Sequence, residues 1–160
     1  MPVIALFVKA ELENVTNFKA PEGHHWCLKV KNSAGEEERD NVYVSSEEEV
    51  ELTGSRGTAH FTIKWDGAKK ESSMSIVEIK GQDFTMTNEK QSEFVPIVAF
   101  ECRGMEPVHW YPEGGYVCES TEGVQFEDVD LTEGEWCEYD GENDLPVSIM
   151  NIEHKFAIMK

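Results

Sequence analysis

The sequence has few basic residues. Lysine and arginine together number 14, against 32 aspartate and glutamate residues, so the 160-residue chain has a formal net charge of -18 at pH 7. Phosphate backbones and anionic membrane surfaces repel such a chain. We therefore expect neither nucleic acid nor a membrane among its partners, and we interpret the excess acid as a solvated surface.

Cysteine is also scarce, and no C-x-x-C motif is present. The four cysteines are widely spaced, and no secretory signal pattern of charged, apolar and small-residue segments begins the chain. Free thiols are typical of a reducing compartment. The sequence therefore predicts a cytoplasmic protein with four reduced, unpaired thiols: Cys27, Cys102, Cys118 and Cys137.

Long apolar runs are absent too. Residues 1–8 are apolar, but Lys9 and Glu11 follow at once. That run is far shorter than the roughly 20 residues that a helix needs to cross a bilayer. We expect no membrane-spanning segment.

Sequence motifs of catalysis are missing. The chain has no G-x-S-x-G elbow, no glycine-rich phosphate loop and no H-E-x-x-H pair. Its cysteines lie in strand-like or acidic surroundings, which raise a thiol pKa and suppress the reactive thiolate. We assign no catalytic residue and expect a protein that is not an enzyme.

The patterns that are present have a period of two, as in half-buried strands. Turn-forming residues separate the alternating segments, and the one capped stretch, residues 45–49, leads into no apolar helical stripe. This predicts an all-β protein with little helix, an antiparallel sandwich or flattened barrel. The expected strands are residues 3–15, 24–31, 41–44, 50–52, 59–65, 73–80, 94–102, 116–119, 125–131 and 147–159.

A weak internal similarity suggests how one domain, residues 1–160, is organised. Residues 4–15 can be laid over residues 97–108, because both are apolar runs that end in an apolar-Glu-x-Val step. Two pseudo-symmetric halves, residues 1–80 and 93–160, would follow from a duplication. Any two apolar strands of a β protein share some of this likeness, so the alternative of no duplication stays open.

Two segments have the pattern of hairpin tips. In residues 28–39 an alternating strand enters Asn32-Ser33-Ala34-Gly35, and in residues 63–72 another enters Trp65-Asp66-Gly67-Ala68. Asparagine, aspartate and glycine are the residues that tight turns require. A small protein with two such tips raises the question of what lies between them.

The segment FECRGMEPV, residues 100–108, is specific enough to suggest a family. Together with residues 4–17, the turn at residues 54–57 and residues 126–131, it resembles the eukaryotic CXXC-motif-containing zinc-binding proteins. The resemblance covers nearly the whole chain. It implies a small, mostly β protein without an established enzymatic activity, in which two C-x-x-C pairs on two hairpin tips hold one zinc ion.

In this chain the ligand positions implied by the resemblance have no cysteine. At the second tip the two positions are occupied by Trp65 and Ala68. At the first tip Ala34 occupies the second position, and the first is occupied by Asn32 or, depending on whether one residue has been deleted, by Lys31. None is an ordinary zinc ligand. We expect the fold without the family's metal site, and hence no cofactor.

Other residues could in principle bind a metal. His24 and His25 are adjacent, but neighbours on a strand point to opposite faces. His60, His109 and His154 stand alone, which is typical of packing residues. The acidic runs at residues 36–38, 47–49 and 138–144 lack the fixed glycine and closing glutamate of a helix-loop-helix calcium site. We assign no metal ligand.

Two functions remain. The first is a non-enzymatic interaction or scaffold protein with an unknown protein partner, and the second is a metal-trafficking or metal-sensing protein that uses residues outside the family site. For the first, an Arg-Gly turn followed by aromatic residues marks a candidate surface, although Arg103 and Glu106 could instead pair across a strand crossing while Trp110 packs in the core. The candidate residues are Arg103, Glu106, His109, Trp110 and Tyr111.

Overall fold

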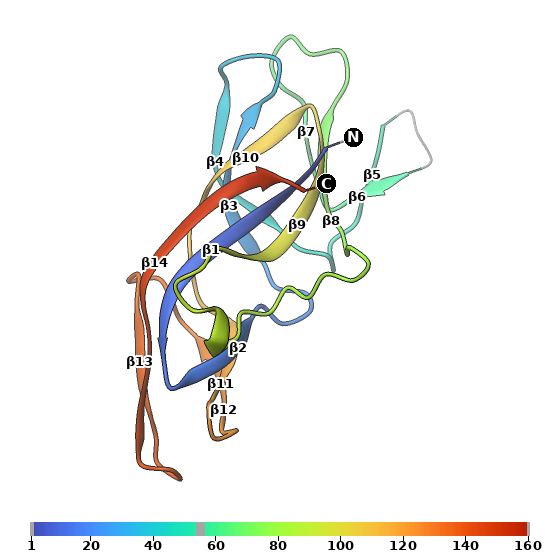
Figure 1. Cartoon of the computed structure of the whole chain (residues 1–160). Coiled ribbons are helices and arrows are strands. Elements are labelled where there is room, and N and C mark those ends of the chain that lie inside the picture. Colours follow the sequence, from blue (N-terminus) through green and yellow to red (C-terminus); the bar gives the residue numbers. More distant parts are fainter. Residues whose placement is uncertain (1, 54–56, 160) are drawn as a thin grey trace.

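The regular secondary structure of the protein is almost entirely antiparallel strands (Figure 1). The computed structural model describes residues 2–53 and 57–159, and 56% of these residues are in strands and 2% in helix. The elements are β1 (Val3–Glu13), β2 (Val15–Lys19), β3 (Trp26–Asn32), β4 (Glu38–Val44), β5 (Val50–Glu51), β6 (Thr58–Ala59), β7 (Phe61–Ile63), β8 (Ser72–Ile76), η1 (Asn88–Lys90), β9 (Val95–Arg103), β10 (Met105–Trp110), β11 (Tyr116–Ser120), β12 (Gln125–Val129), β13 (Trp136–Asp140) and β14 (Leu145–Ile158).

The strands form one curled sheet with smaller sheets packed against it. The six-stranded sheet has the order β13-β14-β1-β9-β8-β7, and the others are β10-β3-β4, β12-β11-β2 and β5-β6. The predicted fold class, an antiparallel all-β sandwich or flattened barrel, is confirmed. Within residues 2–53 and 57–159, no helix is long and apolar enough to span a membrane.

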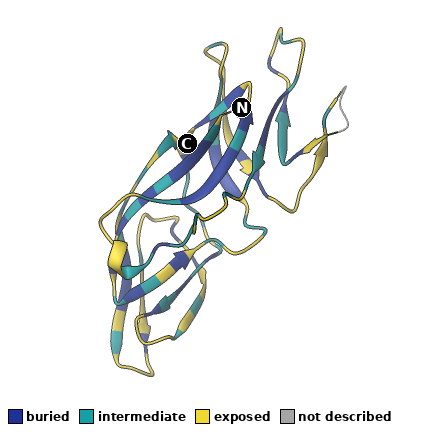
Figure 2. Cartoon of the chain, turned by 45° about the vertical axis from the view of Figure 1, so that its right-hand side comes forward, coloured by how far each residue is buried: buried dark blue, intermediate teal, exposed yellow. Residues whose placement is uncertain are grey.

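Strand β1 is the centre of the large sheet. It pairs with β14 on one side and with β9 on the other, so that Ile4 lies opposite both Ile158 and Phe100. Along its second half Leu12 is buried between exposed Glu11 and Glu13, as the alternating pattern predicts. Figure 2 shows that buried residues are concentrated along the long strands in the middle of the molecule.

Several predicted strand boundaries were wrong. Residues 3–15 do not form one strand, because Asn14 has a φ of 53°, which ends β1 and turns the chain into β2 in another sheet. Residues 59–65 likewise divide into β6 and β7, which belong to different sheets. Asparagine tolerates this left-handed backbone better than most residues, so the break has a local signal.

Strand β2 was predicted only at Val15, and two further strands were missed entirely. Strand β10 contains Pro107, which has no backbone N–H and suits the edge position that β10 has in its sheet. Strand β13 is the edge of the large sheet and includes Glu138 and Asp140, residues that are rare in strands. The pseudo-symmetry of residues 1–80 and 93–160 stays a prediction, and residues 54–56 of the turn at 54–57 lie outside the described residues.

Gly104 joins the large sheet to the β10-β3-β4 sheet. It lies between β9 and β10 with a φ of 75°, and its carbonyl oxygen accepts hydrogen bonds from the Ser33 backbone N–H and the Ser72 hydroxyl, both at 3.1 Å. A Cβ atom on Gly104 would lie 2.4 Å from the Ser72 Oγ. Only glycine fits this backbone and this contact without strain.

The Gly104→Ala variant should therefore be much less stable than a matched control. Gly67 has a similar φ of 77°, but a Cβ atom added to it would have no neighbouring atom within 4 Å. We expect Gly67→Ala to lower the free energy of unfolding by about 1 kcal/mol and Gly104→Ala to lower it by clearly more, as measured by urea denaturation. Equal losses in the two variants would show that the close contact at Gly104 has no energetic effect.

Candidate functional site

The first hairpin tip connects β3 to β4 and is closed by its own hydrogen bonds. The Asn32 side-chain Oδ1 accepts a hydrogen bond from the Ala34 N–H at 3.0 Å, and the Gly35 N–H donates to the Asn32 carbonyl at 3.2 Å. The Asn32 N–H donates to the Glu37 carbonyl at 2.8 Å and continues the strand pairing into the loop. This is an Asx-type turn, which needs no metal to hold its shape.

The second tip connects β7 to β8 and is closed in a different way. The Ala68 N–H donates to the Trp65 carbonyl at 3.0 Å, and Gly67 supplies the left-handed residue of the turn. The Trp65 side chain is only 5% exposed and belongs to the main hydrophobic core. Burial of an indole anchors this tip to the body of the protein.

The two tips project from the same end of the molecule (Figure 1). They are attached to one point, because Ser33 of the first tip and Ser72 at the base of the second both donate to the Gly104 carbonyl. Figure 2 shows both tips as largely exposed loops above a buried base. The β9–β10 turn therefore connects the two tips at their base through hydrogen bonds.

Comparison with known proteins identifies the family. The family described as "CXXC motif containing zinc binding protein, eukaryotic" matches residues 5–157. The chain belongs to this family. A human CXXC motif containing zinc binding protein is 36% identical over 160 residues, which cover 98% of this chain and 99% of the relative. The Drosophila melanogaster UPF0587 protein CG4646 is 35% identical over 98% of each chain.

Solved structures of two relatives have the same fold. A hypothetical protein from Plasmodium falciparum superposes with a TM-score of 0.91 at 31% identity and covers 98% of this chain and 100% of its own. The crystal structure of C1orf123 gives a TM-score of 0.89 at 35% identity and covers 98% and 99%. The family match and these superpositions confirm the resemblance in family and in fold. None of these names refers to an enzymatic activity.

The family name implies zinc, but the residues at the tips do not fit that ion. Asn32, Ala34, Trp65 and Ala68 offer no thiolate, imidazole or carboxylate, the groups from which zinc sites are made. Across residues 2–53 and 57–159, no group of three or more histidine, cysteine, aspartate or glutamate side chains is arranged to hold a metal ion. We therefore derive no chemistry through zinc at the tips.

The predicted contact residues do not form one surface. Trp110 is fully buried, donates from its Nε1 to the Tyr116 hydroxyl at 3.2 Å, and its backbone N–H donates to His154 Nε2 at 3.3 Å. It is a core residue and cannot contact a partner. Arg103 and Glu106 form no ion pair with each other in the part of the chain that the structure describes.

The remaining predicted residues lie on or beside the exposed face of the β10-β3-β4 sheet. The rings of His109 and Tyr111 contact each other edge to face with centroids 4.5 Å apart. A hydrogen bond to Asp40 raises the pKa of Tyr111 to about 12. Sequence reasoning missed Tyr43, which lies on the same sheet. Its side chain is 47% exposed, and its hydroxyl donates a hydrogen bond to Glu113 at 3.0 Å.

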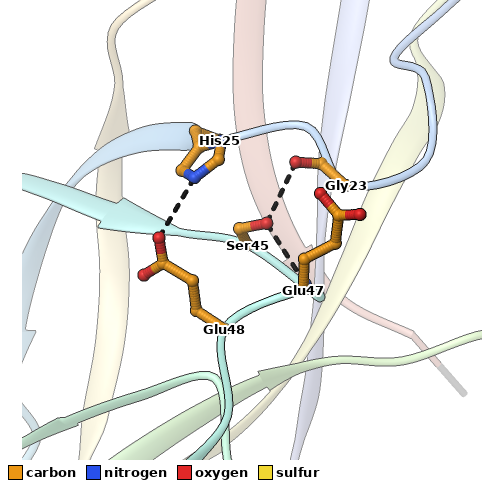
Figure 3. A network of polar contacts seen from close by, with 5 residues as sticks. All are labelled: Gly23, His25, Ser45, Glu47 and Glu48. Atoms are coloured by element: carbon orange, nitrogen blue, oxygen red, sulfur yellow. Dashed lines mark hydrogen bonds and ion pairs between the residues drawn. The ribbon is translucent and has the colours of Figure 1, made fainter.

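The two adjacent histidines point to different environments. His25 contacts Glu48 at 3.2 Å, and beside it the Ser45 hydroxyl donates to the Gly23 carbonyl at 3.0 Å and accepts from the Glu47 N–H at 3.2 Å (Figure 3). His24 instead packs against Trp26 and Tyr116, at centroid distances of 4.8 and 4.4 Å. The expectation that the pair does not share one ion agrees with this geometry.

The cysteines are unpaired within the described structure, with Cys27, Cys102 and Cys118 buried and Cys137 exposed. Burial raises the pKa of the Cys102 and Cys118 thiols to about 12, and it also raises the pKa of Cys27. Protonated thiols are poor nucleophiles.

Sequence reasoning also missed a group of basic side chains beside the second tip. Lys64, Lys69, Lys70 and Arg103 line one cavity at the loop between β7 and β8. The adjacent Lys69 and Lys70 in so acidic a chain are the signal that could have found it. Arg103 thus lies with lysines and not with the aromatic residues that follow it in sequence.

His24 should make the protein less stable in mild acid. Burial, with a smaller contribution from His25, lowers its pKa from 6.5 to about 4. Between these values the unfolded chain binds a proton that the folded chain does not, so stability falls as the pH falls from about 6.5 to about 4. His24→Phe keeps a ring in the packing and removes the titration.

We expect the free energy of unfolding of His24→Phe to depend less steeply on pH than that of the wild type in this range. Urea denaturation at pH 4.5, 5.5, 6.5 and 7.5 measures the difference. His154, whose pKa is also lowered by burial and by His109, contributes the same background to both proteins. Parallel curves for the two proteins would contradict the assignment to His24.

Proposed function

We propose that this protein is a non-enzymatic interaction or scaffold module that keeps the fold of its zinc-binding family without zinc at the hairpin tips. The observation that carries the proposal is the closure of both tips by groups other than thiolates. Asn32 closes the first tip through its side chain, and Trp65 anchors the second in the core. A fold held in this way needs no metal for its stability.

The state of the thiols supports a role without catalysis. Three of the four are buried, where a thiolate is disfavoured, and the names of the relatives refer to no reaction. Free, unpaired thiols also support our proposal that the protein works in the cytoplasm.

The alternative function is metal trafficking or sensing at residues outside the family site. It requires several ligating side chains around one point. Among residues 2–53 and 57–159 no such group is arranged, and His24 and His25 point to different environments. The interaction function is therefore the better supported of the two.

The contact surface that we propose is the exposed face of the β10-β3-β4 sheet, with Tyr43, His109 and Tyr111 at its centre and Glu106 at its edge. Exposed aromatic residues are frequent at protein interfaces, where they bury a large area at a low entropic cost. Tyr43 and Tyr111 are each held by a carboxylate, Glu113 and Asp40 respectively. Side chains that are ordered before binding lose little entropy when a partner covers them.

Zinc analysis tests the proposed loss of the metal. We expect the purified protein to contain no near-stoichiometric zinc by elemental analysis, and a chelator to leave its melting temperature unchanged. A structural zinc contributes on the order of 10 kcal/mol to the folding of small zinc domains, so its removal would be obvious. One zinc per chain together with a chelator-sensitive melting temperature would favour the metal-handling function.

A variant provides the positive control for that measurement. Lys31, Ala34, Trp65 and Ala68 have the spacing of two C-x-x-C pairs, and replacing all four by cysteine would restore the ligand set that the family name implies. Zinc uptake by this variant and not by the wild type would assign the difference to the missing thiolates.

Affinity purification tests the contact surface. Tyr43→Ala should reduce recovery of a specific partner at least several-fold in quantitative mass spectrometry, because aromatic residues at interface centres carry much of the binding energy. Tyr139→Ala is the control, since Tyr139 has a similar exposure of 50% on the edge strand β13. Identical partner lists for wild type and both variants would rule out this face.

A further inference from the structure

The cavity beside the second tip concentrates positive charge in a strongly acidic protein. It has a volume of about 510 Å³ and lies between the loop that joins β7 to β8, the chain after β5 and the end of β9. Four of the 14 basic residues of the chain line it, against one carboxylate. The complete lining is Leu52, Thr53, Lys64, Lys69, Lys70, Glu71, Ser73 and Arg103.

None of the four basic side chains forms an ion pair within the part of the chain that the structure describes. The ion pairs of residues 2–53 and 57–159 are Lys9 with Glu153, His25 with Glu48 and Lys29 with Glu38, and none involves the cavity. With 32 acidic residues in the chain, partners for these cations would have been easy to supply. Unpaired charges of one sign in a concave site focus the electrostatic potential and attract a ligand of the opposite sign.

The walls of the cavity are positioned by hydrogen bonds. The Thr53 N–H donates to the Glu71 Oε1, which connects the chain after β5 to the loop before β8 and engages one oxygen of the single carboxylate in the lining. Ser73 lies opposite Arg103 in the pairing of β8 with β9, and the Ser72 hydroxyl holds the adjoining turn through the Gly104 carbonyl. The base of the site is therefore part of the sheet and not of a loop alone.

The chemistry of the lining favours a phosphoryl group. The guanidinium of Arg103 can donate hydrogen bonds to two phosphate oxygens at once. The three lysines add positive charges, which a phosphoryl dianion balances better than a single carboxylate does. The cavity volume is in the range of sites for small ligands. A long polyanion such as a nucleic acid would extend beyond the cavity. The chain as a whole has a net charge of -18, so the surface outside the cavity would repel it.

We propose that this cavity binds a phosphoryl group carried by a compact ligand. Arg103, Lys64, Lys69 and Lys70 hold the phosphoryl oxygens, and the hydroxyls of Thr53 and Ser73 are additional donors in the lining. The site is independent of the missing zinc, because none of these residues occupies a family ligand position. A phosphorylated side chain of another protein and a free phosphorylated molecule both present this group. The experiment below uses one probe for each source, so that the two can be distinguished.

Isothermal titration of the full chain in low-salt buffer tests the proposal. The probes are inorganic pyrophosphate and a short phosphoserine peptide, with the unphosphorylated peptide as a reference. We expect saturable binding of at least one phosphorylated probe, weakened by added salt. Binding of pyrophosphate alone would indicate a small ligand, and binding of the phosphopeptide alone would indicate a modified protein; either supports the site.

Two charge-matched variants locate the binding. Lys69→Gln with Lys70→Gln should weaken the bound probe about tenfold or more, since each lost charge-assisted contact contributes strongly to affinity. Lys80→Gln with Lys90→Gln removes the same charge from exposed positions outside the cavity and should leave the Kd nearly unchanged. Unaltered melting temperatures confirm that both variants fold.

The proposal is overturned if neither phosphorylated probe binds the wild type, or if both double variants weaken binding equally, which would indicate attraction to basic residues in general. Neither result depends on the zinc content or on the effect of Tyr43→Ala. Failure of the phosphoryl site is therefore distinguishable from failure of the proposed interaction function.

Discussion

The pairing of β1 with two neighbours holds the structure together. β1 lies between β14 and β9 in the large sheet, so the first and last long strands of the chain are adjacent along most of their length. Its buried residues, such as Leu6 and Val8, face the core that the smaller sheets also cover. The turn at Gly104 then connects β9 of this sheet to β10 of the next, and both hairpin tips depend on that turn.

Both hairpin tips are closed by groups other than thiolates. A zinc ion bound by four thiolates would join two tips through one atom. In this chain the Gly104 carbonyl joins them at their base, and each tip is closed by a local device, an Asx-type turn at Asn32 and a buried indole at Trp65. A metal would hold the two tips together at one point. In this chain, several residues hold them through hydrogen bonds at the base and burial of one tip.

Charge is distributed unevenly over the surface. The acidic residues repel large polyanions, whereas the cations of the cavity at Arg103 have no acidic partner among the described residues. The aromatic face at Tyr43 and Tyr111 lies on a different sheet from this cavity. The two proposed sites can therefore be altered separately by mutation.

Much of the fold follows from the sequence by itself. The period of two, the turn residues and the FECRGMEPV segment were sufficient for the all-β class and the family, because strand alternation and tight turns depend on near neighbours in the chain. The same local reasoning located both tips, and the family resemblance then indicated which tip positions lack a cysteine. Local patterns do not determine which strands pair, so the division of residues 3–15 between two sheets and the edge strands β10 and β13 were missed.

The sites depended on tertiary structure for the same reason. Trp110, Arg103 and Tyr111 are close in sequence, yet the first is in the core, the second lines a basic cavity and the third packs on an exposed sheet face. The lysines that join Arg103 come from a loop more than 30 residues earlier in the chain. Alternation gives the side on which a residue points, but only the packing of sheets decides whether that side meets the core, a cavity or solvent.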